Sequence, residues 1–190
     1  VSRAAYLPFQ SLFLREARGL TSGEIGAIAA VRPFVSLVGT PLWAVVADRT
    51  GMHRTILISS LAASGMLLVV MGLVHMDYVS PWSSAYVFFL LMISFAEFIA
   101  SPIGPLVDTS VMELLGSEPQ RYGEVRLWAG VGYGAMALLA GFIVAWAGST
   151  EVIWWLLAIL QVPRLLLVLR FRVSTPHKVV KMELKRQKTL

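Results

Sequence analysis

The chain has 190 residues, of which 57% are hydrophobic and 14% are charged, and its formal net charge is +5. An ordinary soluble domain carries about 25% charged residues, so this composition, with a mean hydropathy of +0.73, excludes a water-soluble protein and predicts a membrane protein with several spans. No cysteine is present, which excludes a disulfide framework.

Six hydrophobic runs follow one another along the chain. They cover residues about 1–14, 25–47, 55–75, 82–115, 121–148 and 151–169. All but the first are long enough to cross a hydrocarbon core, which takes about 20 helical residues. The first run has no initiating Met and no cleavage site, so we interpret it as a truncated first membrane helix and not as a signal peptide. The sequence therefore predicts an all-α integral membrane unit of six helices, residues 1–169, followed by a basic linker segment, residues 170–190.

Positive charge is distributed unequally between the two ends of these helices. When loops are assigned to alternate sides of the membrane, one side carries Arg15 and Arg18. The other side carries Arg49, Arg54, Arg121, Arg126, Arg164, Arg170, Arg172, Lys178, Lys181, Lys185, Arg186 and Lys188. Because Lys and Arg accumulate in cytoplasmic loops, we expect the second side, with the N-terminus and the basic tail, to be cytoplasmic. This bias and attraction to anionic lipid headgroups explain the tail more simply than nucleic-acid binding does.

The turn after the second run, "AVVADRTGMHR", places Asp48, Arg49, Gly51 and Arg54 in close order. A polar turn on the positive side of a membrane explains the arginines, but not the acid followed three residues later by glycine. The pattern resembles the signature of the major facilitator superfamily, with Ala44 where that signature begins with glycine. The resemblance implies that these four residues form a conformational contact between helices that stabilises one access state.

Two ionisable residues are expected deep inside the membrane. Arg32 lies about 12 Å into the second helix, counted from Glu24, which is too deep to reach the interface easily. Glu97 precedes the helix-breaking stretch "SPIGP", and discontinuous helices often line binding sites. We expect Arg32 to face a cavity and to pair with Glu97 or with an anionic solute, or else to form a purely structural pair. Gln10 on the first helix is a further candidate for solute binding.

The hairpin between the fourth and fifth helices is predicted to turn near Ser117. Asp108 lies nine residues before this point and Arg126 nine residues after it, so both would lie about 13 Å from the turn, near the middle of the membrane. Ionisable residues at such depth face a partner or a watery cavity, so we expect an ion pair. Tyr133 follows Arg126 on the same helix face, and charges beside an aromatic ring suit a polyhydroxylated solute. A pair that only locks the hairpin is the alternative.

The stretch "RYGEVRLWAGVGYGA" resembles the start of helix 5 in the lactose-permease-like branch of oligosaccharide and nucleoside proton symporters. In that branch a helix 4 carboxylate lies eighteen residues before an arginine, both bind the sugar, and an aromatic ring follows seven residues later. Asp108, Arg126 and Tyr133 occupy these positions, with aspartate in place of glutamate and tyrosine in place of tryptophan. The resemblance implies the N-terminal half of a proton-coupled transporter for a sugar-like or nucleoside-like solute, with a missing C-terminal six-helix half as its partner.

Two other function classes are weighed against this one. A transporter-like receptor or scaffold that moves no solute is the alternative, because folds are reused. An enzyme is disfavoured, since the sequence shows no nucleophile beside a base, no metal-ligand cluster and no phosphate-binding glycine loop. The expected partners are therefore the lipid bilayer, a small polar solute and the second half, without nucleic acid, and no metal or cofactor is expected besides the proton as coupling ion.

Overall fold

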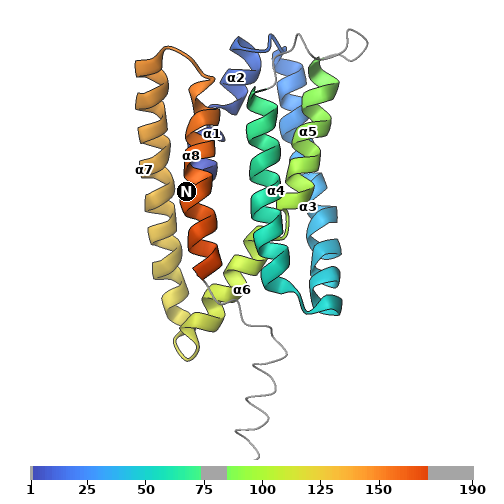
Figure 1. Cartoon of the computed structure of the whole chain (residues 1–190), viewed down its shortest axis with the longest axis vertical. Helices are drawn as coiled ribbons and strands as arrows, with labels where there is room; N and C mark the ends of the chain where they lie inside the picture. The colour runs from blue at the N-terminus through green and yellow to red at the C-terminus, as the bar shows by residue number, and fades with distance from the viewer. Residues whose placement is uncertain (1, 74–84, 171–190) are drawn as a thin grey trace, which may run out of the picture.

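The computed structural model describes residues 2–73 and 85–170, and every regular element in these ranges is a helix. In chain order the elements are α1 (Ser2–Tyr6), α2 (Gln10–Glu16), α3 (Ser22–Thr50), α4 (His53–Leu73), α5 (Ala85–Ala100), α6 (Ile103–Leu115), the short 3-10 helix η2 (Pro119–Arg121), α7 (Tyr122–Ala147) and α8 (Val152–Arg170). Five stretches are long and apolar enough to cross a membrane: Ser22–Thr50, His53–Leu73, Ala85–Leu115, Pro119–Ala147 and Val152–Arg170. The long helices lie side by side as an elongated bundle (Figure 1). The expected all-α membrane fold is confirmed, while the predicted linker after Arg170 and the start of the predicted 82–115 helix lie outside the described residues.

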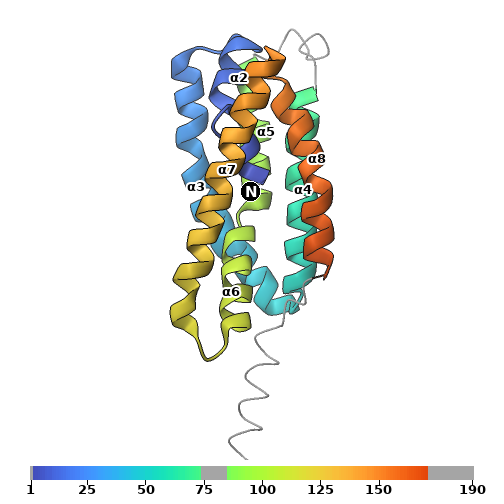
Figure 2. The same cartoon turned by 90° about the vertical axis from the view of Figure 1, so that its left-hand side faces the viewer.

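The first hydrophobic run folds as two short helices instead of the single helix expected from its pattern. Pro8 lies between α1 and α2, and it has no N–H with which to continue the helical hydrogen bonds. Both helices pack inside the bundle, where α1 contacts α7 and α8 and α2 contacts α3. The start of α1 lies about midway along the long helices (Figures 1 and 2). This placement buries the side chains of Ala4, Ala5 and Tyr6 within the bundle.

An aromatic cluster forms the centre of the core. Trp154 of α8 stacks on Tyr6 of α1, with ring centroids 5.9 Å apart, and meets Phe13 of α2 edge-on at 5.0 Å. Phe89 of α5 meets the same Phe13 edge-on at 6.5 Å. All four rings are buried. Because offset and edge-on contacts are the favourable arrangements of aromatic rings, this cluster holds α1 and α2 against α5 and α8.

Two glycines of α4 allow α8 to approach closely. A Cβ atom at Gly72 would overlap the indole of Trp154, and one at Gly65 would overlap the carboxamide of Gln161. The buried Gln161 is satisfied because its Nε2 donates a hydrogen bond to the carbonyl of Leu61 at 2.7 Å. Small residues and interhelical hydrogen bonds are the usual means by which helices associate in membranes. The α4–α8 contact therefore combines both.

The fourth hydrophobic run crosses the membrane as two helices, α5 and α6, which separate at Ser101 and Pro102. A proline has no N–H for the carbonyl four residues earlier. Pro102 therefore frees the carbonyl of Phe98, and Pro105 frees the carbonyl of Ser101. Such freed carbonyls inside a membrane need other donors.

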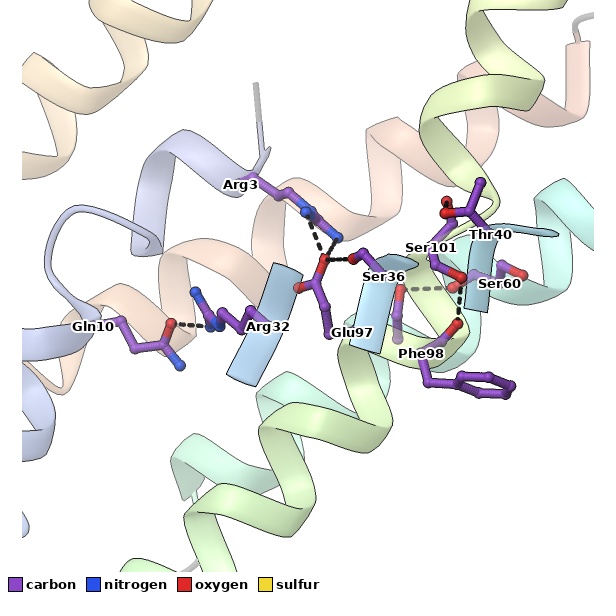
Figure 3. A network of polar contacts seen from close by, with 10 residues as sticks. Arg3, Gln10, Arg32, Ser36, Thr40, Ser60, Glu97, Phe98 and Ser101 are labelled. Atoms are coloured by element: carbon purple, nitrogen blue, oxygen red, sulfur yellow. Dashed lines mark hydrogen bonds and ion pairs between the residues drawn. The ribbon is translucent and has the colours of Figure 1, made fainter. Parts of the chain in front are cut away.

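Helix α3 supplies these donors. The indole Nε1 of Trp43 donates to the Phe98 carbonyl at 3.0 Å, and the hydroxyl of Thr40 donates to the Ser101 carbonyl at 3.5 Å. The Ser101 hydroxyl donates to the Phe98 carbonyl as well, at 2.8 Å (Figure 3). Gly39 makes the approach possible, because a Cβ atom there would lie 2.6 Å from Ser101 Oγ. The break in α5–α6 is thus held by side chains of a neighbouring helix.

Both ends of α3 have clear signals in the sequence. At its start, Thr21 Oγ1 accepts from the N–H of Glu24 at 3.3 Å, and the Glu24 carboxylate accepts from the N–H of Thr21 at 2.8 Å, which is a capping box. At its end, Gly51 takes a positive φ of 66°, a conformation that favours glycine. The turn after Gly51, the α6–α7 hairpin and the end of α8 lie at one end of the bundle (Figure 1).

Candidate functional site

A cavity of about 450 Å³ lies among α1, α3, the broken α5–α6 crossing, α7 and α8. Its charged and hydroxyl-bearing lining residues are Arg3, Ser36, Thr40, Glu97, Ser101, Tyr133 and Arg164. Glu97 and Tyr133 were predicted from the sequence as solute-binding residues, and the structure places both on this cavity. Polar groups from five parts of the chain therefore converge on one space inside a membrane bundle.

Glu97 is the carboxylate of this cavity. Its Oε1 accepts hydrogen bonds from Arg3 Nη1 at 3.4 Å, Arg3 Nη2 at 3.5 Å and Ser36 Oγ at 3.2 Å (Figure 3). The side chain of Glu97 is 16% exposed and that of Arg3 is 41% exposed. Charge-assisted hydrogen bonds are usually about 2.7–2.9 Å long, so the Arg3–Glu97 pair is a loose one. A loose pair next to an open cavity can exchange its partner for another polar group.

Arg32 does not pair with Glu97 in the structure, and its alternative pairing with an anionic solute stays a prediction. Arg32 Nη2 donates instead to the side-chain oxygen of Gln10 at the start of α2 (Figure 3). The reason is the position of the two short N-terminal helices, which bring Arg3 to Glu97 and Gln10 to Arg32. The three candidates predicted here, Arg32, Glu97 and Gln10, are nevertheless neighbours. Arg32 and Glu97 line one small pocket beside the cavity, together with Arg3, Tyr6 and Arg164.

Arg164 was assigned from chain order on or near the basic end of the helices, and the structure places it inside α8. It lies in α8 six residues before Arg170, about 9 Å inside the end of the helix. It is half-buried, lines the cavity and donates to Gln161 Oε1 at 3.3 Å. Sequence reasoning also missed Arg3, because the first run was treated as the remainder of a helix of unknown position. The signal that could have identified both residues is that each is the single arginine inside an apolar run, Arg3 in residues 1–14 and Arg164 in residues 151–169.

Asp108 and Arg126 form the ion pair that their spacing predicted. Arg126 Nη1 lies 3.1 Å from Asp108 Oδ1 and 3.2 Å from Oδ2, and it donates to the hydroxyl of Tyr122 at 2.7 Å. The side chains are 48% and 64% exposed for Asp108 and Arg126, respectively. Neither lines the cavity, whereas Tyr133, seven residues further along α7, does. The hairpin therefore carries a balanced charge pair outside the cavity lining and contributes Tyr133 to that lining.

The turn between α3 and α4 contains the predicted conformational motif. Asp48 Oδ1 lies 3.2 Å from Nε2 of His53, across the turn that Gly51 closes. Arg54 Nη2 donates to the carbonyl of Leu169 in the last turn of α8 at 2.7 Å. Arg49, the remaining member, is exposed at the end of α3. The motif thus joins α3 to α4 and α4 to α8, and its role in an access state stays a prediction. His53, the partner of Asp48, is buried, although the sequence assigned no role to it.

Comparison with known families is decisive at this point. The family model described as the MFS_1 like family matches residues 2–189. The chain belongs to this family. As a member, it is a multi-pass membrane protein of the major facilitator type, and its family is one of transporters and not of enzymes.

Known relatives of this MFS_1-like chain are transporters. It is 29% identical over 136 residues to a maltose permease of Geobacillus stearothermophilus, an alignment that covers 72% of this chain and 32% of the permease. It is 25% identical over 135 residues to the uncharacterized transporter YwbF of Bacillus subtilis (strain 168), covering 71% of this chain and 32% of that protein. The chain thus spans about a third of the length of these relatives. No solved structure matches the chain.

Proposed function

We propose that this MFS_1-like chain is the substrate-binding N-terminal part of a proton-coupled secondary transporter for a sugar-like or nucleoside-like solute. The observation that carries the proposal is the polar cavity of about 450 Å³ inside the membrane bundle. Binding pockets for small molecules usually measure about 300–1,000 Å³, so a solute of this class fits the space. The likeness to a protein named maltose permease supports a sugar.

Asp108, Arg126 and Tyr133 are assigned to the hydroxylated body of the solute. The carboxylate can accept hydrogen bonds and the guanidinium can donate them, so the pair suits a molecule with several hydroxyl groups. The ring of Tyr133 is 37% exposed and borders the cavity, where it can pack against the apolar face of a sugar. Glu97 on the cavity, Arg32 in the small pocket beside it and Gln10, which is hydrogen-bonded to Arg32, complete the proposed set.

The proton is the proposed coupling ion. Glu97 is a carboxylate inside a membrane-spanning helix, and its only ionic partner among the described residues is the loosely held Arg3. Carboxylates at such positions commonly serve proton movement in transporters. Proton uptake at Glu97 would remove its negative charge and release Arg3. The released guanidinium could then bind the solute, so protonation and solute binding would be coupled.

We further propose that the solute is moved by rocking of this bundle against a second six-helix half, with the site between the two. The greater length of the relatives supports such a half. The excess of arginines at the end of the bundle that carries the α3–α4 turn supports a cytoplasmic location for that end. Asp48, Arg49, Gly51 and Arg54 would then control an access state from the cytoplasmic side.

The test is uptake into proteoliposomes that contain the complete transporter. Labelled maltose is offered with and without an imposed pH gradient, and the variants Asp108→Asn and Arg126→Gln are compared with Arg121→Gln. Arg121 lies on the same hairpin and forms an exposed ion pair with Glu118 at 3.0 Å, so it is a matched control. We expect gradient-driven uptake that the first two variants lose while they stay folded.

Each part of the proposal can fail separately. Unchanged uptake in Asp108→Asn and Arg126→Gln would remove these residues from the site. Equal uptake with and without the imposed pH gradient would contradict proton coupling. Solute binding without any uptake would favour the receptor alternative.

A further inference from the structure

Positive charge exceeds negative charge around the cavity and the small pocket beside it. Three arginines, Arg3 of α1, Arg32 of α3 and Arg164 of α8, line these spaces together with one carboxylate, that of Glu97. The three cations come from helices far apart in the chain, so their meeting is a property of the fold. Arg3 and Arg164 line both the cavity and the small pocket.

Glu97 can neutralise only one of these cations, and it is held by Arg3. Within residues 2–73 and 85–170, Arg32 and Arg164 make no ion pair. Each donates to a neutral carboxamide instead, Gln10 for Arg32 and Gln161 for Arg164. The Nε atom of Arg32 is buried and has no hydrogen-bond partner in this part of the chain.

Uncompensated guanidinium groups inside a membrane protein are energetically expensive and usually face a partner or a watery cavity. The Asp108–Arg126 pair shows the contrast, because it carries equal numbers of positive and negative groups. The cavity itself is lined by Arg3, Arg164 and Glu97, which leaves one positive charge in excess. A solute with one negative charge would balance it.

We propose that Arg3 and Arg164 form a carboxylate subsite, with Arg32 adding attraction from the small pocket beside the cavity, so that the site prefers a sugar acid to a neutral sugar. The inference rests on the proposed function, since it assumes that this cavity receives a transported solute. The long Arg3–Glu97 contacts, 3.4 and 3.5 Å, allow the carboxylate of the solute to take the place of Glu97 on Arg3. Ser36, Thr40 and Tyr133 line the same cavity and offer hydroxyl groups to the rest of the sugar.

The test uses glucuronate and glucose, which differ only in a carboxylate in place of a CH₂OH group. Equilibrium binding of each is measured on the purified complete transporter in detergent micelles. We expect glucuronate to bind at least about tenfold more tightly, as a charge-assisted contact implies. In Arg164→Gln this preference should fall close to one, and in Arg164→Lys it should fall partly, because a lysine cannot make the two parallel hydrogen bonds of a guanidinium.

Controls keep the outcome decisive. Arg15→Gln removes an exposed arginine of α2 that does not line the cavity, and it should keep the full preference. If Arg164→Gln does not fold, Arg3→Gln tests the same subsite at a side chain that is already 41% exposed. Equal or tighter binding of glucose, a preference that survives both substitutions, or no binding of either sugar would overturn the inference.

Three further results distinguish the carboxylate subsite from a phosphate subsite and from the transport proposal. Tighter binding of glucose 6-phosphate than of glucuronate would show that the subsite is selective for a phosphate group, which would overturn the carboxylate subsite. Gradient-driven maltose uptake without any preference for glucuronate would overturn the carboxylate subsite and leave the transport proposal intact. A clear preference for binding glucuronate, without uptake of glucuronate or maltose, would support the subsite and contradict transport.

Discussion

Gly65→Ala tests the close contact between α4 and α8. The new methyl group would overlap the carboxamide of Gln161, which must then move and lose its 2.7 Å hydrogen bond to the Leu61 carbonyl. Overpacking of a filled core costs about 1–3 kcal/mol, and an interhelical hydrogen bond in a membrane protein is worth about 0.6 kcal/mol on average. Alanine is better than glycine in a helix by about 1 kcal/mol. We therefore expect the free energy of unfolding to fall by about 0.5–2.5 kcal/mol.

Gly134→Ala is the matched control, because a Cβ atom at Gly134 of α7 has no neighbour within 4 Å. This substitution should be neutral or stabilising by up to about 1 kcal/mol. The assay is unfolding by sodium dodecyl sulfate in mixed micelles, followed by tryptophan fluorescence. If Gly65→Ala is no more destabilising than Gly134→Ala, the contact does not exist as described.

A double-mutant cycle sharpens this test. Gln161→Ala vacates the space that the methyl group of Gly65→Ala needs, so the double variant should be more stable than the sum of the two changes predicts, by at least about 1 kcal/mol. Strict additivity would refute the reasoning. Because Gln161 also accepts from Arg164 at 3.3 Å, the single variant Gly65→Ala should weaken glucuronate binding as well.

Three further predictions concern the broken α5–α6 crossing, the α3–α4 turn and the cavity. Trp43→Phe removes the indole donor from the Phe98 carbonyl and should lower the free energy of unfolding by about 0.5–1.5 kcal/mol in the same micelle assay; an unchanged value would show that the carbonyl does not need this donor. Arg54→Gln removes the contact with the last turn of α8, so the distribution of distances between spin labels on the adjacent ends of α4 and α8 should become broader. An unaltered distribution would argue against the contact. Glu97→Gln removes the carboxylate that competes for Arg3, so equilibrium dialysis should show glucuronate binding roughly fivefold more tightly, equivalent to about 1 kcal/mol of relieved repulsion, whereas weaker binding would contradict competition.

Local patterns in the sequence were sufficient for the long helices and for one ion pair. Apolar runs of about 20 residues leave few alternatives to a membrane helix, and the prolines after Ala100 marked the break in the fourth run. The Asp108–Arg126 pair could be predicted because a short turn fixes the register of a hairpin, so equal spacing from the turn means equal depth. In each case the decisive information lies within a few turns of one segment.

Contacts between distant segments could not be predicted in this way. The Arg3–Glu97 pair joins residues 94 positions apart, and it depends on how far α1 enters the bundle. The position of Arg164 on the cavity was missed, because alternation of loops assigns charges to a side of the membrane but does not show that a residue about 9 Å inside the end of a helix faces a cavity. Gln161 gave no signal, since its partner is a backbone carbonyl exposed by a glycine on another helix.

The spacing of the α4–α8 contact has a consequence for movement. Gly65 and Gly72 are seven residues apart, as are their partners Gln161 and Trp154, so two side chains fit two notches about 10 Å apart. Sliding one helix past the other by a turn would drive the indole of Trp154 out of its notch and into the side chains beside it. The two helices therefore translate and tilt as one rigid body. We expect relative motion more readily at the α5–α6 joint, where side-chain hydrogen bonds from α3 can be exchanged without unwinding a helix.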